Sequence, residues 1–572
     1  MIRKIEDSLV IVLAGQAGQG IQSIENILST LLKRSGYNYF STSELMSRVR
    51  GGINSTEIRI SSKPIAGFLD RIDLLIPLHN DGIEHLKKRT SPNTIVIGEK
   101  DKIDYEKIID VQFTQIAKEI GNAIYSNTVA AGYICGLLKV NLKLCQEFIV
   151  DYFADKDEAI QNKNREAITK GHELGKHLSE LDINIEKSHT VKDQLIMDGA
   201  EAVSLGALAS GCNYVCGYPM SPSTSVLQNM SVYSKKFDII VEQVEDEVGV
   251  INMALGAWYA GARAMTTTSG GGLALMSEGI SLCGMMESPM VLHLAQRPGP
   301  ATGLATRTEQ GDLNLALYSG HGDFPRIILS PGTLEAGFTL TKDAFNLAEK
   351  YQVPVFILTD QYYVNSRYNT PAFDTSDLKI DNRIIKTSPD YKRYAFTENG
   401  ISPRGIPGYG SGTICAGSNE HDESGHITED PVLRTKMVDK RLNKLQLIKA
   451  DIIPPKLIGN NDYKTLVVSW GSTFNIVNEA VEMLGRNDLA LLHFSWLFPL
   501  AENTLEYFQQ ADKVIIVENN ATAQFAQLIK LETGYDIKDK ILKYNGRPFS
   551  VEEVTHEINK LIGTGGNSEK QI

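Results

Sequence analysis

One stretch near the middle of the chain, residues 241–278, constrains the fold more than any other. Acidic residues come first, and apolar residues follow at spacings of three and four, which predicts a helix with acids at its start. Threonines then predict a buried strand, and three glycines predict a tight turn before a second helix at Leu273. The acids are Glu242, Glu245, Asp246 and Glu247, the apolar residues are Val248, Ile251, Leu255 and Trp258, and the glycines are Gly270, Gly271 and Gly272. This order of elements indicates an α/β fold that offers one carboxylate to a bound cofactor.

The acids at the helix start also have a simpler interpretation. Acidic side chains in a first turn complement the helix dipole, and this is their usual role. A stripe of small residues on the same helix, Gly249, Gly256 and Ala260, predicts close packing against another backbone. The chain before and after the helix has to decide between the two interpretations.

Length and composition narrow the class of protein. A chain of 572 residues is typical of roughly three or four domains. The net charge of −12 argues against nucleic acid as the main partner. No apolar run reaches the length of about 18 residues that a membrane span needs, and we expect a cytoplasmic protein with no membrane partner. The six cysteines form no CxxC pair, which predicts reduced thiols and no iron–sulfur cluster in this chain.

Residues 1–185 are predicted to form a Rossmann-like domain. The apolar run that ends at Ala14 is interpreted as its first strand, and a helix starts at Ile21 after the glycine-rich residues 15–20. A strand, a glycine turn and a helix can bind an anion at the helix start. As a dinucleotide fingerprint the spacing G-x-x-G-x-G is weak, so simple turn chemistry stays open for this motif and for Arg48–Gly52.

Further elements of this segment are expected from its apolar runs. Strands are predicted at 55–61, 73–77 and 94–97, the last two of them parallel. The charged helical stretch 155–186 is predicted to end the domain and to serve as a linker.

Polar residues follow three predicted strands in the next part of the chain. The strand at 214–217 leads into a turn in which two prolines bracket Met220-Ser221, and the strand at 289–294 is followed by Arg297 and the loop 301–312. Because the carboxyl ends of parallel strands meet at one edge of a sheet, we expect these groups and the glycines to converge on one crevice. A rigid turn with a helix cap is the alternative role for Ser221.

The sequence runs of this region resemble a known family. YPMSPST, EDEVGVINMALGAWYAGARAMTTTSGGG and QRPGPATGLATRTEQGDL are similar to the α subunit of the thiamine-diphosphate-dependent 2-oxoacid:ferredoxin oxidoreductases. GQAGQG and RVRGG near the N-terminus resemble the γ domain of the same enzymes. The resemblance covers nearly the whole chain, and it implies a γ–α fusion of the kind common in 2-oxoglutarate:ferredoxin oxidoreductase α subunits.

The resemblance implies a multi-domain α/β chain. The expected parts are a Rossmann-like γ domain at 1–185, a thiamine pyrimidine-binding domain at 190–376, a loop-rich linker at 377–455, a transketolase C-terminal-like domain at 456–565 and a disordered tail at 566–572. The C-terminal-like domain is structural in this family.

The resemblance also implies roles for single residues. Glu247 falls on the glutamate that bonds to the aminopyrimidine of thiamine, and Glu245 is the neighbour that could be confused with it. Ser221 falls on the family's threonine, although Met220-Ser221 departs from the usual Ile-Thr, and Arg297 falls on its active-site arginine. Both would stabilise a developing oxyanion. Further contacts are expected from Tyr218, Pro219 and Gly271 to the cofactor, and from Thr306, Arg307 and Thr308 to the substrate.

Two motifs of thiamine enzymes of this kind are missing from the sequence. It contains no GDG with a downstream asparagine for diphosphate and magnesium, and no cysteine cluster. The family carries both on a β subunit. The resemblance therefore implies that a β subunit holds Mg²⁺ and [4Fe–4S], that coenzyme A is the co-substrate and ferredoxin the electron acceptor, and that the assembly is (αβ)₂. No metal ligand is predicted in this chain.

Residues 398–449 contain two further patterns. His421 and His426 lie near three acids, but a spacing of five residues does not place both on one helical face, so a structural role is favoured over a metal site. The helix predicted at 430–449 carries six Lys or Arg residues, and we expect these to form a solvated face.

The substrate is left open by the residues alone, because pyruvate, branched-chain and aryl 2-oxoacids use the same chemistry. Arg307 favours 2-oxoglutarate, since a second guanidinium in the crevice suits a second carboxylate. Its alternative role is to pair with Glu309 or Asp312 and brace the loop. Two other classes also stay open, a nicotinamide-dependent Rossmann dehydrogenase that uses GQAGQG and a non-catalytic scaffold subunit that would tolerate loss of Glu247.

Overall fold

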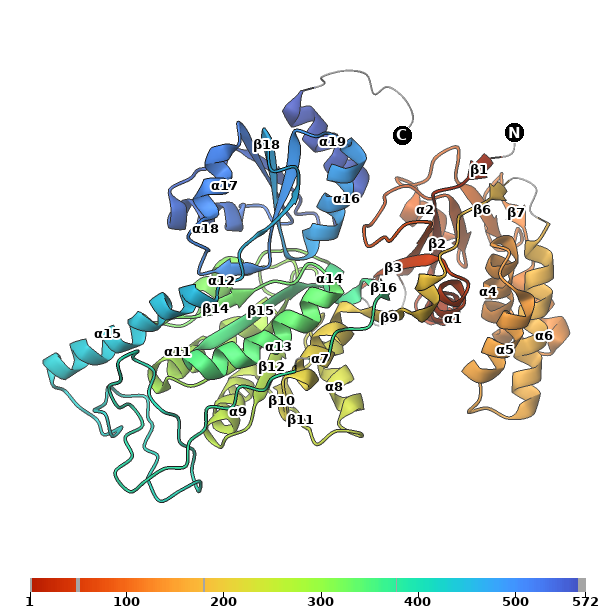
Figure 1. Cartoon of the computed structure of the whole chain (residues 1–572). Coiled ribbons are helices and arrows are strands. Elements are labelled where there is room, and N and C mark those ends of the chain that lie inside the picture. The colour runs from red at the N-terminus through yellow and green to blue at the C-terminus, as the bar shows by residue number, and fades with distance from the viewer. Residues whose placement is uncertain (1–2, 48–51, 178–180, 377, 564–572) are drawn as a thin grey trace. The chain divides into compact units, whose positions relative to one another are not determined.

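The computed structural model describes residues 3–47, 52–177, 181–376 and 378–563, and the chain divides into two compact units (Figure 1). The first unit is Met1–Met197 with Asn365–Ala372, and the second is Asp198–Val364 with Phe373–Ile572. The expected tail and all of the Arg48–Gly52 turn except Gly52 lie outside the described residues. No helix in the described ranges combines the length and the apolar character that a membrane crossing needs.

The first unit is built on an eight-stranded sheet. Its strands are β2 (Ser8–Gln16), β3 (Asn38–Glu44), β4 (Ile53–Ser61), β5 (Leu74–Pro77), β6 (Ile95–Gly98), β7 (Ile109–Asp110), β9 (Leu195–Asp198) and β16 (Arg367–Thr370), in the order β7-β6-β5-β2-β4-β3-β16-β9. The parallel pairing of β2, β5 and β6 confirms the predicted strands. Strand β16 was not predicted, because it pairs antiparallel with β3 from more than three hundred residues away.

Helices α1 (Ile21–Arg34), α2 (Asp81–Leu86), α3 (Phe113–Ile120), α4 (Ser126–Leu137), α5 (Leu142–Tyr152) and α6 (Glu158–Gly175) complete the first unit. Two of them, α4 and α6, pack at very close range through four glycines, Gly132, Gly136, Gly171 and Gly175. A Cβ at any of these would lie 2.0 to 2.4 Å from a carbonyl oxygen of the other helix. Within the charged stretch 155–186, α6 therefore packs into the core of the unit, and the predicted linker part contains β8 (Leu181–Ile183), which pairs with β1 (Arg3–Ile5).

The second unit contains a seven-stranded sheet. Its strands are β10 (Tyr214–Gly217), β11 (Ile240–Gln243), β12 (Ala264–Thr268), β13 (Met290–Gln296), β14 (Ile327–Leu329), β15 (Pro354–Asp360) and β20 (Trp496–Phe498), in the order β11-β10-β12-β13-β15-β14-β20. All are parallel except β20. Every residue of β12, β13 and β15 is buried, as is typical of a parallel sheet covered on both faces. The strands β10, β12 and β13, whose ends carry the polar motifs, are neighbours.

The helices of this sheet are α7 (Gly199–Ala209), α8 (Thr224–Tyr233), α9 (Glu247–Tyr259), α10 (Gly270–Leu275), α11 (Ser277–Met286), α12 (Leu313–Tyr318), α13 (Leu334–Tyr351) and α14 (Gln361–Asn365). The predicted acidic helix is α9, but Val248 is 48% exposed and does not belong to its buried stripe. No atom lies within 4 Å of a Cβ added at Gly256, so the predicted close packing is wrong at this residue among those described, whereas a Cβ at Gly249 would lie 3.0 Å from the Val244 side chain. The predicted glycine turn is also wrong, because the three glycines form the first turn of α10.

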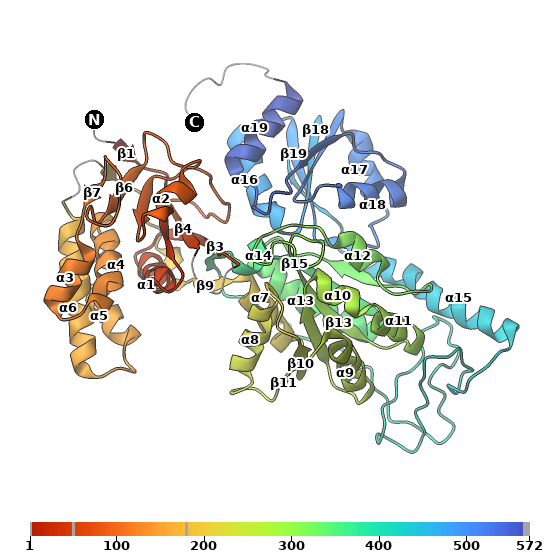
Figure 2. The ribbon, with the colours of Figure 1, turned by 180° about the vertical axis from the view of Figure 1, so that it is seen from behind.

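A five-stranded sheet forms the C-terminal part of the second unit (Figure 2). Its strands are β17 (Lys456–Gly459), β18 (Thr465–Trp470), β19 (Leu489–Phe494), β21 (Lys513–Glu518) and β22 (Asp539–Leu542), in the order β17-β19-β18-β21-β22, with α16 (Phe474–Leu484), α17 (Thr504–Gln510), α18 (Gln524–Thr533) and α19 (Val551–Ile562) around it. Only β17 is antiparallel. Buried apolar residues of both sheets form one continuous core.

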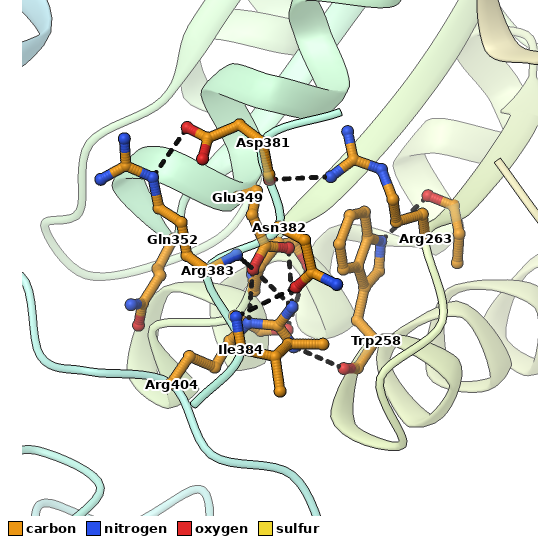
Figure 3. Close-up of polar contacts among 12 residues, drawn as sticks. Trp258, Arg263, Glu349, Gln352, Asp381, Asn382, Arg383, Ile384 and Arg404 are labelled. Carbon is orange, nitrogen blue, oxygen red and sulfur yellow. Dashed lines mark hydrogen bonds and ion pairs between the residues drawn. The ribbon is translucent and has the colours of Figure 1, made fainter. Parts of the chain in front are cut away.

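The segment between the two sheets is irregular until α15 (Pro431–Ile448) and is held by buried ion pairs. Figure 3 shows Arg404, which binds the Glu349 carboxylate and donates to the carbonyl of Trp258 at the end of α9 at 3.0 Å. The predicted solvated face of α15 is confirmed for Arg434 and Lys436 but wrong for Lys440 and Lys444, which are buried against Glu287 at 2.6 Å each.

The two histidines of this segment do not come together. His421 stacks on the Tyr394 ring with centroids 3.7 Å apart, whereas the His426 ring is exposed beside Asp422. The stacked ring gives His421 the structural role favoured from its spacing.

Candidate active site

The acidic start of α9 presents one buried carboxyl group. Asp246 caps the helix by accepting the Gly249 N–H at 2.7 Å, and it is exposed like Glu242 and Glu245. Glu247 is only 3% exposed, and its Oε1 atom has no hydrogen-bond partner among the described residues. A buried, unpaired carboxylate oxygen costs folding free energy, so this group is suited to a donor on a bound molecule.

The three glycines of α10 have three different surroundings. A Cβ at Gly272 would lie 2.7 Å from Glu247 Oε1 and 2.1 Å from Thr268 Oγ1, so glycine here is required by the buried acid. A Cβ at Gly270 would lie 2.4 Å from the Asp312 carboxylate. No atom lies within 4 Å of the corresponding position at Gly271, which therefore borders open space one residue before the glycine that packs on Glu247.

The ends of β10, β12 and β13 meet at one carbonyl group. Ser221 accepts two hydrogen bonds at its main-chain oxygen, from Arg297 Nη1 at 2.7 Å and from Ser269 Oγ at 2.9 Å. This confirms the predicted convergence of the three strand ends. The Ser221 side chain is exposed, and Arg297 is half-buried, with its pKa lowered by burial and partly restored by Asp312.

Two acids of this site were not assigned a chemical role from the sequence. Burial raises the pKa of Asp312 to about 6 against the opposing charge of Arg297, and its Oδ2 atom has no partner among the described residues. Burial and the neighbouring Asp312 raise the pKa of Glu309 to about 7. Their signal in the sequence is their position, at the end of a loop that returns to the same strand ends.

The loop 301–312 separates the three residues predicted to contact substrate. Thr308 is 1% exposed. Its hydroxyl donates to Asp360 Oδ1 at 3.2 Å and accepts from the Tyr362 N–H at 3.1 Å. Its hydroxyl is therefore engaged inside the protein. Thr306 and Arg307 are half-buried, and the Arg307 side chain begins against Gly546.

The residues present fit an aminopyrimidine ring beside α9. The unpaired Glu247 Oε1 supplies an acceptor for a ring N–H, and the open position at Gly271 leaves space for a planar group. Tyr218 is 39% exposed and Pro219 is half-buried, both at the end of β10. Within the described ranges no group of three or more His, Cys, Asp or Glu side chains could hold a metal ion.

Comparison with protein families matches two parts of the chain. Residues 205–440 match the family described as pyruvate flavodoxin/ferredoxin oxidoreductase, thiamine diphosphate-binding. Residues 10–174 match the family described as pyruvate ferredoxin/flavodoxin oxidoreductase.

Individual proteins match over most of their length. The α subunit of 2-oxoacid:ferredoxin oxidoreductase from a Sulfolobus species is 31% identical, and the alignment covers 98% of each chain. The 2-oxoglutarate synthase subunit KorA of Methanothermobacter marburgensis is 29% identical over 65% of this chain and 99% of its own. A solved structure of 2-oxoglutarate:ferredoxin oxidoreductase from Magnetococcus marinus, with 2-oxoglutarate, coenzyme A and succinyl-CoA bound, is 31% identical and has a TM-score of 0.92 over 98% of this chain and 100% of that one.

Proposed function

The chain belongs to the 2-oxoacid:ferredoxin oxidoreductase family as an α subunit, and from this we propose that it forms one wall of a thiamine diphosphate site that acts on 2-oxoglutarate. The reaction takes a 2-oxoacid, coenzyme A and oxidised ferredoxin to acyl-CoA, CO₂, reduced ferredoxin and a proton. The observation that carries the proposal is the buried Glu247 Oε1, which has no hydrogen-bond partner among the described residues and against which Gly272 packs.

The substrate is supported by the relatives and by one residue. KorA subunits are named for 2-oxoglutarate synthase, and the Magnetococcus marinus enzyme has 2-oxoglutarate bound. Arg307 lies on the loop that leaves β13, ten residues after Arg297. A bidentate pair between its guanidinium and the distal carboxylate of 2-oxoglutarate would select this substrate over pyruvate and over branched-chain and aryl 2-oxoacids.

Each site residue of this chain has a defined task in the proposal. When bound, thiamine diphosphate supplies the nucleophilic carbon that attacks the 2-oxo group. Glu247 holds or releases a proton at Oε1 toward the pyrimidine ring, and burial keeps water from competing for that atom. Tyr218, Pro219 and Gly271 would border the ring.

Arg297 and Ser221 face the reacting carbonyl in this proposal. The Arg297 guanidinium is oriented by its bond to the Ser221 main-chain oxygen, which leaves the exposed Ser221 hydroxyl available to the substrate. A fixed positive charge and a hydroxyl donor stabilise negative charge that develops on the carbonyl oxygen. Thr306 lies on the loop 301–312 beside Arg307 and is assigned to the substrate with it, whereas the internal bonds of Thr308 favour a bracing role for that residue.

A β subunit would complete the site. It would hold Mg²⁺ and the [4Fe–4S] cluster, pass electrons to ferredoxin and join this chain in an (αβ)₂ assembly in the cytoplasm. The relatives named as α subunits support a multisubunit enzyme. Large apolar side chains are exposed on the elements that frame the site, Tyr218 at 39%, Val248 at 48% and Leu275 at 55%, and a partner would cover them. Expressed alone, the chain should be colourless and inactive.

The test of the catalytic assignment compares two neighbouring acids. The chain is co-expressed with its β subunit, and CoA-dependent reduction of ferredoxin is measured with 2-oxoglutarate. Glu247→Gln should lower turnover by about 10²–10⁴-fold, because a positioned acid–base group is lost. The control, Glu245→Gln, changes an exposed acid two residues earlier and should leave turnover close to that of the unmodified enzyme. Equal activity of the two variants would make this chain a scaffold instead.

The test of the substrate assignment uses Arg307→Met. We expect the loss of transition-state stabilisation, calculated from the ratio of kcat/KM in the unmodified enzyme to that in the variant, to be about 2–4 kcal/mol larger for 2-oxoglutarate than for 2-oxobutyrate. Only 2-oxoglutarate has a distal carboxylate that would lose its partner. Equal losses on both substrates would leave Arg307 as a brace of the loop.

A further inference from the structure

The loop that carries Arg307 is held by the C-terminal sheet of the same unit. Three hydrogen bonds fasten it, from the Thr308 N–H to the Gly546 carbonyl at 3.2 Å, from the Gln310 N–H to the Asn519 carbonyl at 2.7 Å, and from Gln310 Nε2 to the Trp470 carbonyl at 2.9 Å. The Asn519 N–H returns a bond to Gln310 Oε1 at 2.9 Å. The loop is therefore bonded to the C-terminal part at Thr308 and at Gln310.

The three acceptors lie at the carboxyl ends of three adjacent parallel strands. Trp470 ends β18, Asn519 follows β21, and Gly546 follows β22. This edge is where open α/β sheets bind their ligands. Here the edge is occupied by the chain's own loop, and α12, which follows the loop, lies beside the C-terminal sheet in both views (Figures 1 and 2).

The contact is closest at Gly546. Its φ is +78°, and a Cβ built there would lie 2.9 Å from Leu304 Cδ1 and 3.2 Å from Arg307 Cβ. Asn519 is hydrogen-bonded to both ends of this turn, because its side-chain amide donates to the carbonyls of Lys543 at 2.8 Å and Arg547 at 3.3 Å. The turn 543–547 thus sets where the Arg307 side chain begins.

From this geometry we infer that the C-terminal sheet is the device that sets substrate selectivity, with Gly546 and Asn519 as positioning residues for Arg307. The inference rests on the proposed contact between Arg307 and the distal carboxylate. It assigns the C-terminal-like domain a role beyond the structural one that the family resemblance implies. A small displacement of the turn moves the guanidinium without touching Glu247 or Arg297.

The experiment compares two glycine substitutions in the complex with the β subunit. Gly546→Ala adds a methyl group against Leu304 and Arg307, and Gly534→Ala is the matched control, because its φ is +76° and no atom lies within 4 Å of the added group. Both variants carry the same backbone strain. Steady-state kinetics with 2-oxoglutarate and 2-oxobutyrate are measured together with amide hydrogen exchange of residues 304–312.

For Gly546→Ala we expect KM for 2-oxoglutarate to rise about tenfold, with kcat and the KM for 2-oxobutyrate nearly unchanged. The reason is that a displaced Arg307 guanidinium would no longer contribute binding free energy to the distal carboxylate. The amides of Thr308 and Gln310 should exchange faster, and Gly534→Ala should change neither readout. If Gly546→Ala does not assemble with the β subunit, the double variant with Leu304→Ala removes the nearest clash and keeps the contact with Arg307.

The outcomes separate this inference from the proposed substrate. Equal behaviour of Gly546→Ala and Gly534→Ala, while Arg307→Met still changes selectivity, overturns the positioning role. If neither Gly546→Ala nor Arg307→Met changes selectivity, the contact with the distal carboxylate is overturned and the selectivity role falls with it. Faster amide hydrogen exchange of residues 304–312 in Gly546→Ala, but not in Gly534→Ala, would then still support the hydrogen bonding of the loop to the C-terminal sheet.

Discussion

Buried charges are treated in opposite ways in two regions of the second unit. Near α15 both oxygens of each buried carboxylate face a cation, since Glu287 has the Lys440 and Lys444 ammonium groups at 2.6 Å, one at each oxygen, and Arg404 binds both oxygens of Glu349. At the end of the seven-stranded sheet, Glu247 and Asp312 each keep one buried oxygen without a partner among the described residues. A buried unpaired acceptor destabilises a fold, so its presence at the strand ends indicates a group kept for a ligand. Removing a partner from the paired acids should therefore destabilise the fold, whereas the unpaired acids are the ones to test for a role toward a ligand.

Substitution of the paired acid should have the largest effect on stability. Glu287→Gln leaves Lys440 and Lys444 buried without a countercharge, and we expect the free energy of unfolding to fall by about 3–5 kcal/mol. Urea unfolding followed by tryptophan fluorescence measures it, because all three tryptophans, Trp258, Trp470 and Trp496, lie in the second unit.

The control for this prediction is an exposed acid that also faces two lysines. Asp536 pairs with Lys530 at 3.2 Å and with Lys538, all of them substantially exposed. Asp536→Asn should therefore change the unfolding midpoint little. An equal loss of unfolding free energy in Glu287→Gln and Asp536→Asn would show that burial does not decide how much each ion pair contributes. Adding Lys444→Met to Glu287→Gln should recover part of the stability.

The second prediction concerns the arginine that fastens the irregular segment to α9. Arg404→Met leaves Glu349 buried and removes the bond to the Trp258 carbonyl, so we expect a loss of about 3 kcal/mol, measured in the same way. Arg383→Met is the control in the same segment, since its pair with Asp381 at 2.8 Å is more than one third exposed and should contribute less than about 1 kcal/mol. A loss from Arg383→Met as large as from Arg404→Met would contradict this ranking.

The two regions also differ in how far the sequence predicted them. The strands at the site end follow contiguous apolar runs, and Glu247 stands next to the glycines that pack on it, so both were predictable from local pattern. The buried lysines of α15 were not, because their partner Glu287 lies about 150 residues earlier and a basic helix is solvated by default. The engagement of Thr308 by Asp360 was missed for the same reason, since the pattern of a loop does not reveal its distant partners.

The third prediction concerns a buried acid whose neutralisation should raise the free energy of unfolding, whereas neutralising Glu287 should lower it. Burial raises the pKa of Asp312 to about 6 from 3.8, so the folded state binds a proton that the unfolded state has released between about pH 4 and 6. Stability contributed by this group is present below pH 4 and is lost as the pH rises through 6. Asp312→Asn should therefore stabilise the isolated chain by about 1–2 kcal/mol at pH 7.5.

The pH dependence separates this effect from a general improvement in packing. Arg297 and Glu309 are the charged groups that act on Asp312, and both remain in the variant. The gain from Asp312→Asn should shrink toward zero at pH 4, as measured by tryptophan-monitored unfolding. A gain that is constant from pH 4 to 7.5 would mean that the carboxylate charge is not its source.

The smallest stability effect is expected at Gly271. It is compared with the effect at Gly272, the next residue in the first turn of α10. Alanine there meets no atom within 4 Å and replaces glycine in a helix, so Gly271→Ala should stabilise the chain by about 0.5 kcal/mol. Gly272→Ala, its neighbour, would place a methyl group 2.7 Å from Glu247 Oε1 and should destabilise. If the open position at Gly271 is reserved for the pyrimidine ring, the stabilised variant should bind thiamine diphosphate more weakly in the complex with the β subunit, as measured by calorimetric titration. A variant that is more stable and binds the cofactor with unchanged affinity would place the ring elsewhere along α9.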